Sequence, residues 1–323
     1  MSKSTKILLG IICLFIVAFI VYITIIIKQP NQISEKITPI KIGSFSKAID
    51  YAPYLVAKNK GWFEELAKKY NTTVEYTEFQ SLPPINEALA TDNIDIIFEA
   101  EPPAIVGRSA GIGVKIISAG VDLTQEIIVN SESNINTVSD LKGKKIAVLA
   151  GTGSHYGIGK VLTEKGLSLS DVEIIDMIPP DAKAAFESRQ VDAWAVWPPF
   201  PQQEELAGKG RGLNGSEIFI QSIVAAREKF IKENPKLTQD LLIVINRSQE
   251  WIVNNEENSK QIVAAELDLP IEVVELAWSK HNFQPKFNEN AITDIQAKAD
   301  FMYDLKFIKN KVEVDSDLIC NLF

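Results

Sequence analysis

Two stretches of this sequence, about 100 residues apart, carry the same short pattern. In each, a hydrophobic pair is followed after four residues by Ile or Val and an aspartate, then by a strand-like run and two prolines. The copies run from Ala88-Leu89 to Pro102-Pro103 and from Ala185-Phe186 to Pro198-Pro199. Before them, Lys41-Ile42 with Tyr51 resembles Lys145-Ile146 with Tyr156. This period is too long for a solenoid and predicts two similar lobes; coincidence is the alternative.

Short β-branched runs alternate with helical stretches over most of the chain. Strands are predicted at 39–45, 73–79, 94–99, 114–119, 127–130, 145–150, 172–177 and 191–197. Helices are predicted at 51–69, 82–91, 102–110, 154–165, 181–189, 237–254, 257–267, 271–280 and 290–305, with a helical turn at 138–141. This order predicts α/β units around largely parallel sheets. The length of 323 residues fits about two domains.

An uncharged apolar run occupies residues 7–27, between Lys3 and Lys6 on one side and Lys28 on the other. Its 21 residues match the thickness of a bilayer core, and no small-x-small cleavage site closes it. The run predicts an uncleaved signal anchor (residues 1–28), followed by a polar tether (29–38). Lysines before the span favour a cytoplasmic N-terminus and a folded part outside the cytoplasm. A signal peptide cut at a less obvious site is the alternative, with the same compartment.

The charge balance excludes a basic nucleic-acid surface for the folded part. The chain has a net charge of −9, and the three lysines of the first 28 residues leave −12 for the remainder. Cys13 and Cys320 are the two cysteines, and His155 and His281 are far apart, so the sequence offers neither a disulfide framework nor a clustered metal site. We therefore expect no metal, no cofactor and no nucleic-acid partner.

The repeated segments predict helices that begin just beyond the carboxyl ends of strands. Proline is tolerated in the first turn of a helix, so Pro102-Pro103 and Pro198-Pro199 mark two such starts. The corners at 44–50 and 151–154 carry small and capping residues. Helix starts offer free N–H groups and the positive end of the helix dipole, at the sheet edge where α/β proteins bind ligands. Four such corners predict a cleft for a small anion or an anionic head group.

Several segments resemble the extracytoplasmic substrate-binding proteins of ABC importers, in the branch for aliphatic sulfonates, taurine and nitrate. The matching segments are Asp50-Tyr51-Ala52-Pro53-Tyr54-Leu55-Val56-Ala57-Lys58-Asn59-Lys60-Gly61-Trp62-Phe63, Asp140-Leu141-Lys142-Gly143-Lys144-Lys145-Ile146-Ala147-Val148, Gly151-Thr152-Gly153-Ser154-His155-Tyr156, Val191-Asp192-Ala193-Trp194-Ala195-Val196-Trp197 and Asn234-Pro235. The resemblance runs from about Ile40 to Leu276, and the combination is more specific than any one segment.

This resemblance implies a two-lobed type II periplasmic-binding-protein fold of class α/β, with two crossover strands near 125–130 and 217–225. Lobe 1 would comprise 39–125 and 225–323, and lobe 2 would comprise 126–224. The implied function is capture of a small anionic solute, with an aliphatic sulfonate ahead of nitrate or taurine, and delivery to ABC permease subunits that work with a cytoplasmic ATPase. We expect a membrane-anchored monomer with no enzymatic activity, facing the periplasmic or extracellular side.

The residues expected to contact the ligand are Ser46, Tyr51, Glu101, Thr152, Gly153, Ser154, His155, Trp197 and Arg227. Hydroxyls of Thr152 and Ser154 suit an oxyanion, although plain helix caps would look the same. His155 either donates to the ligand or faces solvent, and Trp197 either walls the cleft or packs within its lobe. Ser46 and Tyr51 lie at the first corner.

The two remaining candidates carry charge. The planar guanidinium of Arg227 suits an anionic head, with a surface arginine as the alternative. Glu101 is unexpected beside an anion, and a hydrogen-bond partner in the hinge region is its alternative role. Asp50 and Glu101 could compensate for an aspartate that the family often has after the second-lobe tryptophan, where this chain has Trp197-Pro198-Pro199. Without that aspartate a zwitterion such as taurine is less favoured.

Two other functions remain open from the sequence. An enzyme of the same fold, of the kind that makes pyrimidine or menaquinone precursors, is one; its pyrimidine branch would need a cysteine-rich iron motif that Cys13 and Cys320 do not supply. A membrane-tethered ligand sensor is the other. A binding protein needs no nucleophile–base pair, and the sequence shows none.

Overall fold

A computed structural model describes residues 38–45, 48–285 and 287–320. The chain separates into residues 1–38 and a second compact unit, Pro39–Phe323, to which the following description applies. The predicted anchor at 7–27, most of the tether and Ser46 lie outside the described residues. Within the described part, no helix is both long and apolar enough to cross a bilayer.

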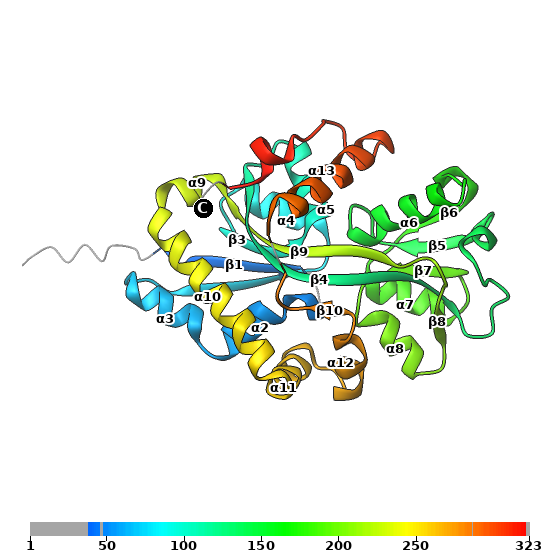
Figure 1. Cartoon of the computed structure of the whole chain (residues 1–323), viewed down its shortest axis with the longest axis horizontal. Helices are drawn as coiled ribbons and strands as arrows, with labels where there is room; N and C mark the ends of the chain where they lie inside the picture. The colour runs from blue at the N-terminus through cyan, green and yellow to red at the C-terminus, as the bar shows by residue number, and fades with distance from the viewer. Residues whose placement is uncertain (1–37, 46–47, 286, 321–323) are drawn as a thin grey trace, which may run out of the picture. The chain divides into compact units, whose positions relative to one another are not determined.

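Strands and helices alternate through the first two thirds of this unit, and helices dominate the last third (Figure 1). The strands are β1 (Ile40–Phe45), β2 (Val74–Phe79), β3 (Ile96–Ala100), β4 (Val114–Asn130), β5 (Lys145–Val148), β6 (Glu173–Asp176), β7 (Ala193–Val196), β8 (Gly210–Gly212), β9 (Ile218–Arg227) and β10 (His281–Asn282). The helices are α2 (Ala52–Asn59), α3 (Trp62–Lys69), α4 (Leu82–Ala90), α5 (Glu101–Ser109), α6 (Gly153–Glu164), α7 (Pro179–Glu187), α8 (Phe200–Leu206), α9 (Glu228–Glu233), α10 (Pro235–Asn254), α11 (Glu256–Leu267), α12 (Ile271–Trp278) and α13 (Glu289–Asp304). Short helical turns are η1 (Ile49–Tyr51), η2 (Val138–Leu141), η3 (Leu169–Asp171) and η4 (Val314–Leu318).

Among the described residues the strands join in the order β2-β1-β3-β9-β4-β7-β5-β6, and β8 and β10 pair with β4 at its sides. β4 is shared: it pairs with β9 as far as Gln125, and from Glu126 onward with β7 and β8. We call β2, β1, β3, β9, β10 and the first part of β4 the first sheet half. The rest of β4 with β7, β5, β6 and β8 forms the second sheet half.

Both sheet halves are covered by helices on two faces, as expected for α/β units (Figure 1). In the first half, Phe98 of β3 packs against the rings of Tyr54 and Phe63 from α2 and α3. In the second half, Trp194 of β7 packs against Phe186 and Phe200 and is 1% exposed. Each sheet half therefore has its own aromatic core.

The predicted alternation of strands and helices is confirmed, but the prediction of largely parallel sheets is wrong, because the long strands β4 and β9 run antiparallel to their neighbours. Two predicted elements also differ. The helix predicted over 51–69 is divided into η1, α2 and α3, because Gly61 has a left-handed φ of 71°. The strands predicted at 114–119 and 127–130 belong to the single long strand β4. Buried and exposed side chains do not alternate regularly along β4, because this strand pairs with β9 through register shifts and then changes neighbours.

Candidate ligand cleft

The corners predicted from the two repeats lie at the carboxyl ends of parallel strands. β1 runs parallel to β3 in the first sheet half, and β5 runs parallel to β7 in the second. Phe45 ends β1 and Trp197 follows β7, and their ring centroids are 5.7 Å apart. The structure therefore brings a corner of the first half against a corner of the second.

The start of α6 is the helix end best suited to an anion. Helices α4, α5, α7 and α8 each carry proline at the first or second position, which removes N–H donors there. In α6 these positions are Gly153 and Ser154, whose N–H groups have no hydrogen-bond partner among the described residues. Two free donors and the positive end of a 12-residue helix therefore coincide at this point.

The Thr152 side chain caps α6, and its hydrogen bonds are all to neighbouring backbone groups. Its hydroxyl donates to the Leu149 carbonyl (2.6 Å) and accepts from the His155 N–H (3.4 Å). Only 2% of the residue is exposed. These contacts are those of a helix cap, which was the alternative reading of this residue.

The next two residues hold the helix start against β4 and β9. The Ser154 hydroxyl donates to the Gln125 side-chain carbonyl on β4 at 2.8 Å, and both residues are buried. A Cβ atom on Gly153 would lie 3.1 Å from the Gln125 amide and from Ile220 of β9. The glycine thus permits a close approach of the helix start to the shared strand β4 and its neighbour β9.

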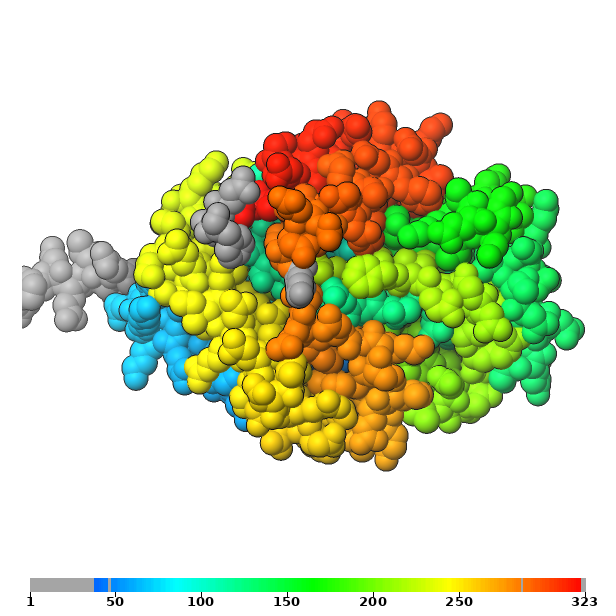
Figure 2. Space-filling view, in the orientation of Figure 1, coloured from blue at the N-terminus to red at the C-terminus, as the bar shows by residue number. Residues whose placement is uncertain are grey.

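His155 joins the second sheet half to the C-terminal segment. Its Nδ1 accepts from the Gly151 N–H at 3.2 Å, and its ring stacks on Phe307 at 4.0 Å. Burial lowers the pKa of His155, and the carboxylate of Asp176 opposes this effect. Figure 2 shows the green and orange-red segments meeting along the upper edge of the molecule. Phe307 carries no recognisable motif, so its role could not have been predicted.

A cavity of about 480 Å³ lies beside this helix start. It is lined by Ser81, Leu82, Pro83, Asn86, Val106, Leu149, Ala150, Gly151, His155, Asp176, Met177, Ile178 and Phe307. One wall therefore comes from the start of α4, in the first half, and the other from the corners that follow β5 and β6. Gly151 has a φ of 78°, and a Cβ there would lie 2.5 Å from Leu82 Cδ1, so the two walls are in contact.

Buried acidic groups lie at the first corner. From the sequence, Asp50 was expected only to compensate for the aspartate that is missing after Trp197. Burial raises the pKa of Asp50 to about 7 and that of Glu99 to about 8. Asp50 is 3% exposed, and its Oδ1 has no hydrogen-bond partner. Burial, followed by the charges of Asp50 and Glu99, raises the pKa of Tyr51, which is itself 4% exposed. With these raised pKa values, Glu99 and Tyr51 are mostly uncharged at neutral pH and Asp50 is about half ionised, which reduces repulsion of an anion.

Glu101 is engaged in a buried ion pair. Both carboxylate oxygens accept from the Gln221 N–H (3.0 and 2.9 Å), and Lys298 Nζ donates to Oε1 at 2.5 Å. Burial raises the pKa of Glu101, and Lys298 opposes this effect. Glu101 thus has the contacts of its alternative role, a hydrogen-bond partner on β9, which pairs with the shared strand β4. Lys298 was missed because nothing local in the sequence links α13 to α5.

Arg227 lies away from these corners. It pairs with Val114 in the sheet, whereas Ser222, nearer the other end of β9, pairs with Ala100 at the carboxyl end of β3. Its guanidinium bonds to Asp92, Asp95 and the Ile94 carbonyl. An arginine bonded to two carboxylates at the amino end of β3 is not placed to meet a ligand at the carboxyl end.

Among the described residues, no three or more His, Cys, Asp or Glu side chains gather in a way that could hold a metal ion. The donors available near the cleft are the backbone N–H groups at the start of α6 and the His155 imidazole, which suit an oxyanion, because the Thr152 and Ser154 hydroxyls already donate to Leu149 and Gln125.

Comparison with known proteins identifies the family of this chain. The family model described as NMT1/THI5 like matches residues 48–259. A Bacillus subtilis (strain 168) protein, named as a candidate aliphatic sulfonates-binding protein, is 36% identical over 281 residues, which cover 84% of this chain and 83% of that protein.

Two solved structures share the fold. One is the alkanesulfonate-binding protein SsuA from Xanthomonas axonopodis pv. citri bound to MOPS, with a TM-score of 0.75 and 25% identity over 87% of this chain and 97% of that one. The other is the periplasmic aliphatic sulphonate binding protein SsuA from Escherichia coli, with a TM-score of 0.72 and 26% identity over 88% and 98%. The chain therefore belongs to the NMT1/THI5-like family and has the mixed α/β periplasmic-binding-protein fold.

Proposed function

We propose that this chain is the extracytoplasmic solute-binding component of an ABC importer, and that its ligand is a small aliphatic sulfonate. The observation that carries the proposal is the start of α6, where the N–H groups of Gly153 and Ser154 have no partner among the described residues. A cavity of about 480 Å³ reaches the loop before this helix at Gly151 and the helix itself at His155, although Gly153 and Ser154 do not line it. A sulfonate oxygen would accept from these donors and gain from the helix dipole. The sulfonate-binding names of the relatives support this ligand class.

The mechanism is capture between two lobes without chemistry on the ligand. The lobes proposed are 39–125 with 225–323, and 126–224. The boundary at 125/126 follows the point at which β4 changes neighbours, whereas the boundary at 224/225 falls within β9. Contacts between Phe45 and Trp197, and between His155 and Phe307, then join one lobe to the other. Closure of the two lobes over a ligand would exclude water and strengthen the hydrogen bonds to the anion.

The proposed ligand-contacting residues are Tyr51, Gly153, Ser154, His155 and Trp197. Ser46, which lies outside the described residues, is proposed on the sequence alone. Thr152 supports them as a helix cap. We leave out Glu101 and Arg227, because their charges are already paired inside the protein. Recognition of the anion thus depends on neutral donors, despite the net charge of −9.

The apolar run at 7–27 would hold the folded unit at the outer face of the membrane, where a permease can receive the ligand. Extraction of membranes with alkaline carbonate tests this part: a chain that stays in the pellet is anchored, and a chain released to the supernatant is not.

Calorimetric titration of the full chain in detergent tests the ligand class. We expect ethanesulfonate to bind, with taurine and nitrate weaker and 1-propanol, a neutral ligand of similar size, silent. If none of ethanesulfonate, taurine and nitrate binds, the proposal is wrong. Turnover of any of them, followed by NMR, would instead favour an enzyme of this fold.

A matched pair of variants tests the site itself. Ser154→Ala removes the hydroxyl, whereas Ser154→Pro removes both the hydroxyl and the N–H, at a helix position where α4 and α5 already carry proline. We expect the proline variant to bind ethanesulfonate at least about tenfold more weakly than the alanine variant, because one charge-assisted hydrogen bond contributes about 1.5–3 kcal/mol. Equal affinities would show that the α6 start is not the anion site.

A further inference from the structure

A second cavity, of about 410 Å³, lies where the neighbouring strands β4 and β9 meet the start of α13. It is lined by Glu101, Asp122, Phe219, Gln221, Asn282, Gln284, Asn288, Asn290, Ala291, Asp294 and Ile295. We call it the strand-junction pocket. Its volume exceeds the roughly 30 Å³ of a single water molecule many times over. None of the residues just proposed to contact the sulfonate lines it.

Hydrogen-bond acceptors dominate this pocket. Gln221 is 5% exposed, and its Oε1 has no hydrogen-bond partner, while its Nε2 donates to Asp122 Oδ1 at 2.7 Å. Asp122 Oδ2 accepts from Asn282 Nδ2 at 2.9 Å. An unpaired, buried carbonyl oxygen costs free energy until a donor reaches it. Gln221 Oε1 therefore lacks a donor.

The net charge of the pocket also favours a ligand that supplies donors. Glu101 and Asp294 share the ammonium of Lys298, which bonds to them at 2.5 and 2.6 Å. Asp122 is bonded to the amides of Gln221 and Asn282 and has no cation of its own. Three carboxylates and one ammonium leave an excess of two negative charges. A ligand that brings donors should therefore also bring positive charge.

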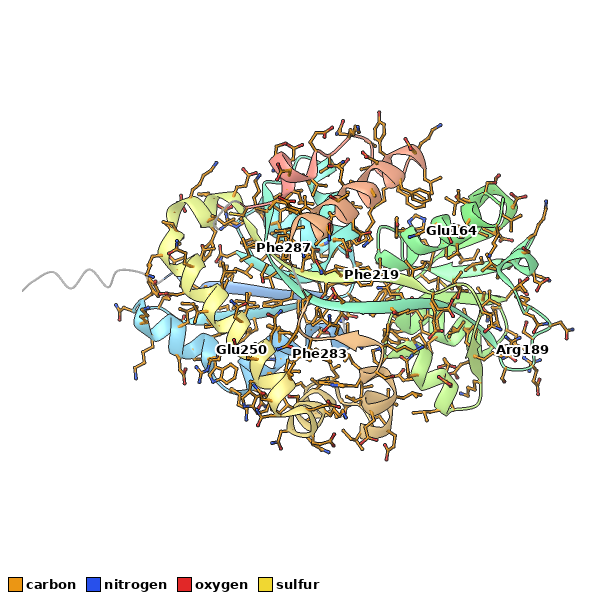
Figure 3. The ribbon with its side chains drawn as sticks, in the orientation of Figure 1. Glu164, Arg189, Phe219, Glu250, Phe283 and Phe287 are labelled. Atoms are coloured by element: carbon orange, nitrogen blue, oxygen red, sulfur yellow. The ribbon has the colours of Figure 1, made fainter. Side chains whose placement is uncertain are left out.

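Phe219 provides an apolar wall. It lies on β9 (Figure 3) and is 50% exposed, which is unusual for a large aromatic side chain. Lys298 Nζ lies 5.2 Å from the ring centroid, so the ring is already next to one cation. The exposed part of the ring can cover a short alkyl chain.

We propose that the strand-junction pocket binds a small aliphatic amine in its ammonium form. The ammonium donates to Gln221 Oε1 and lies beside Asp122, and its alkyl chain packs on Phe219. A metal ion is a poorer fit, because the described residues include no cluster of three or more side chains that could hold one. The site is distinct from the anion cleft, so the two ligands need not compete.

Titration of the full chain in detergent with n-butylamine at pH 7.5 tests this proposal, with n-butanol as the neutral control. We expect saturable binding with a dissociation constant on the order of 1 mM for the amine and none for the alcohol. No saturable binding of the amine, or equal binding of the alcohol, overturns the proposal.

Variants locate the binding. Gln221→Leu removes the acceptor at similar volume and should weaken amine binding at least tenfold, whereas Gln190→Leu, at an exposed position, should not change it. If Gln221→Leu does not fold, Asp122→Asn, which keeps the shape and removes one charge, should weaken binding several-fold. Unchanged affinity in the folded variant of this pair overturns the assignment. Ethanesulfonate binding, measured on the same samples, reports the anion cleft separately.

Discussion

Phe45, at the end of β1, and Trp197, directly after β7, face one another with ring centroids 5.7 Å apart and planes inclined by 44°. Both are at least nine-tenths buried. The tilted geometry is a favourable one for aromatic rings, contributing about 0.5–1.5 kcal/mol beyond the burial of surface. This pair connects two corners that come from remote parts of the sequence.

Replacing the tryptophan of this pair should weaken ligand binding more than it weakens the fold. We expect Trp197→Leu to lower ethanesulfonate affinity about tenfold, because the contact that joins the two corners is lost with the indole ring. Trp251→Leu is the control, since Trp251 packs on Trp62 and not on the cleft. Calorimetric affinities and melting temperatures distinguish the outcomes, and similar affinities in the two variants would contradict a role for Trp197 in closure.

The Glu101–Lys298 pair should behave as a buried ion pair. Lys298→Met leaves the Glu101 carboxylate unpaired, and we expect it to lower the free energy of unfolding by about 3–5 kcal/mol. The double variant Glu101→Gln, Lys298→Met should recover a large part of this loss, because no uncompensated charge remains. Urea unfolding of the single and double variants measures the coupling. Additive losses would mean that the two side chains are energetically independent.

Stability should fall as the pH rises toward 8. Burial raises the pKa of Asp50 from 3.8 to about 7 and that of Glu99 from 4.5 to about 8. An acid with a raised folded-state pKa stabilises the fold fully below its unfolded value, and this contribution is lost as the pH rises through its folded value.

Asp50→Asn should therefore be more stable than the unmodified chain at pH 8.5 and should show a flatter pH profile. The gain is at most about 4 kcal/mol, from 1.36 kcal/mol per pKa unit. Glu75→Gln, at an exposed position on β2, is the control. Chemical unfolding between pH 4 and pH 9 provides the profile, and parallel profiles for Asp50→Asn and the unmodified chain would refute the assignment.

Gly151 should be sensitive to substitution for two separable reasons. Its φ of 78° costs any other residue about 1–2 kcal/mol, and a Cβ there would lie 2.5 Å from Leu82 Cδ1. Gly215 has a similar φ of 76° but nothing within 4 Å of the added Cβ. We expect Gly151→Ala and Gly215→Ala to share the backbone cost, and only Gly151→Ala to weaken ethanesulfonate binding. Equal affinities would show that the Leu82 contact does not affect the cleft.

Much of the architecture could be predicted from the sequence. Strands and helices have strong local signals: β-branched runs mark the strands, and proline pairs such as Pro102-Pro103 mark helix starts at α5. The repeated segments correctly indicated equivalent corners. Trp194 lies within a predicted strand, and its position in that strand predicts a core residue. Family membership also followed from local motifs, which survive where overall identity is low.

Only the tertiary structure decided which side chains are available to a ligand. Glu101 is paired with Lys298, and Arg227 with Asp92 and Asp95, through contacts between segments far apart in the sequence. A charged residue considered from the sequence alone predicts a contact with a charged ligand. When the same residue is buried beside an opposite charge, it is no longer available to the ligand. Local patterns thus determined the order of elements and the helix start that can receive an anion. The partners of each charge depended on long-range packing, which no local periodicity encodes.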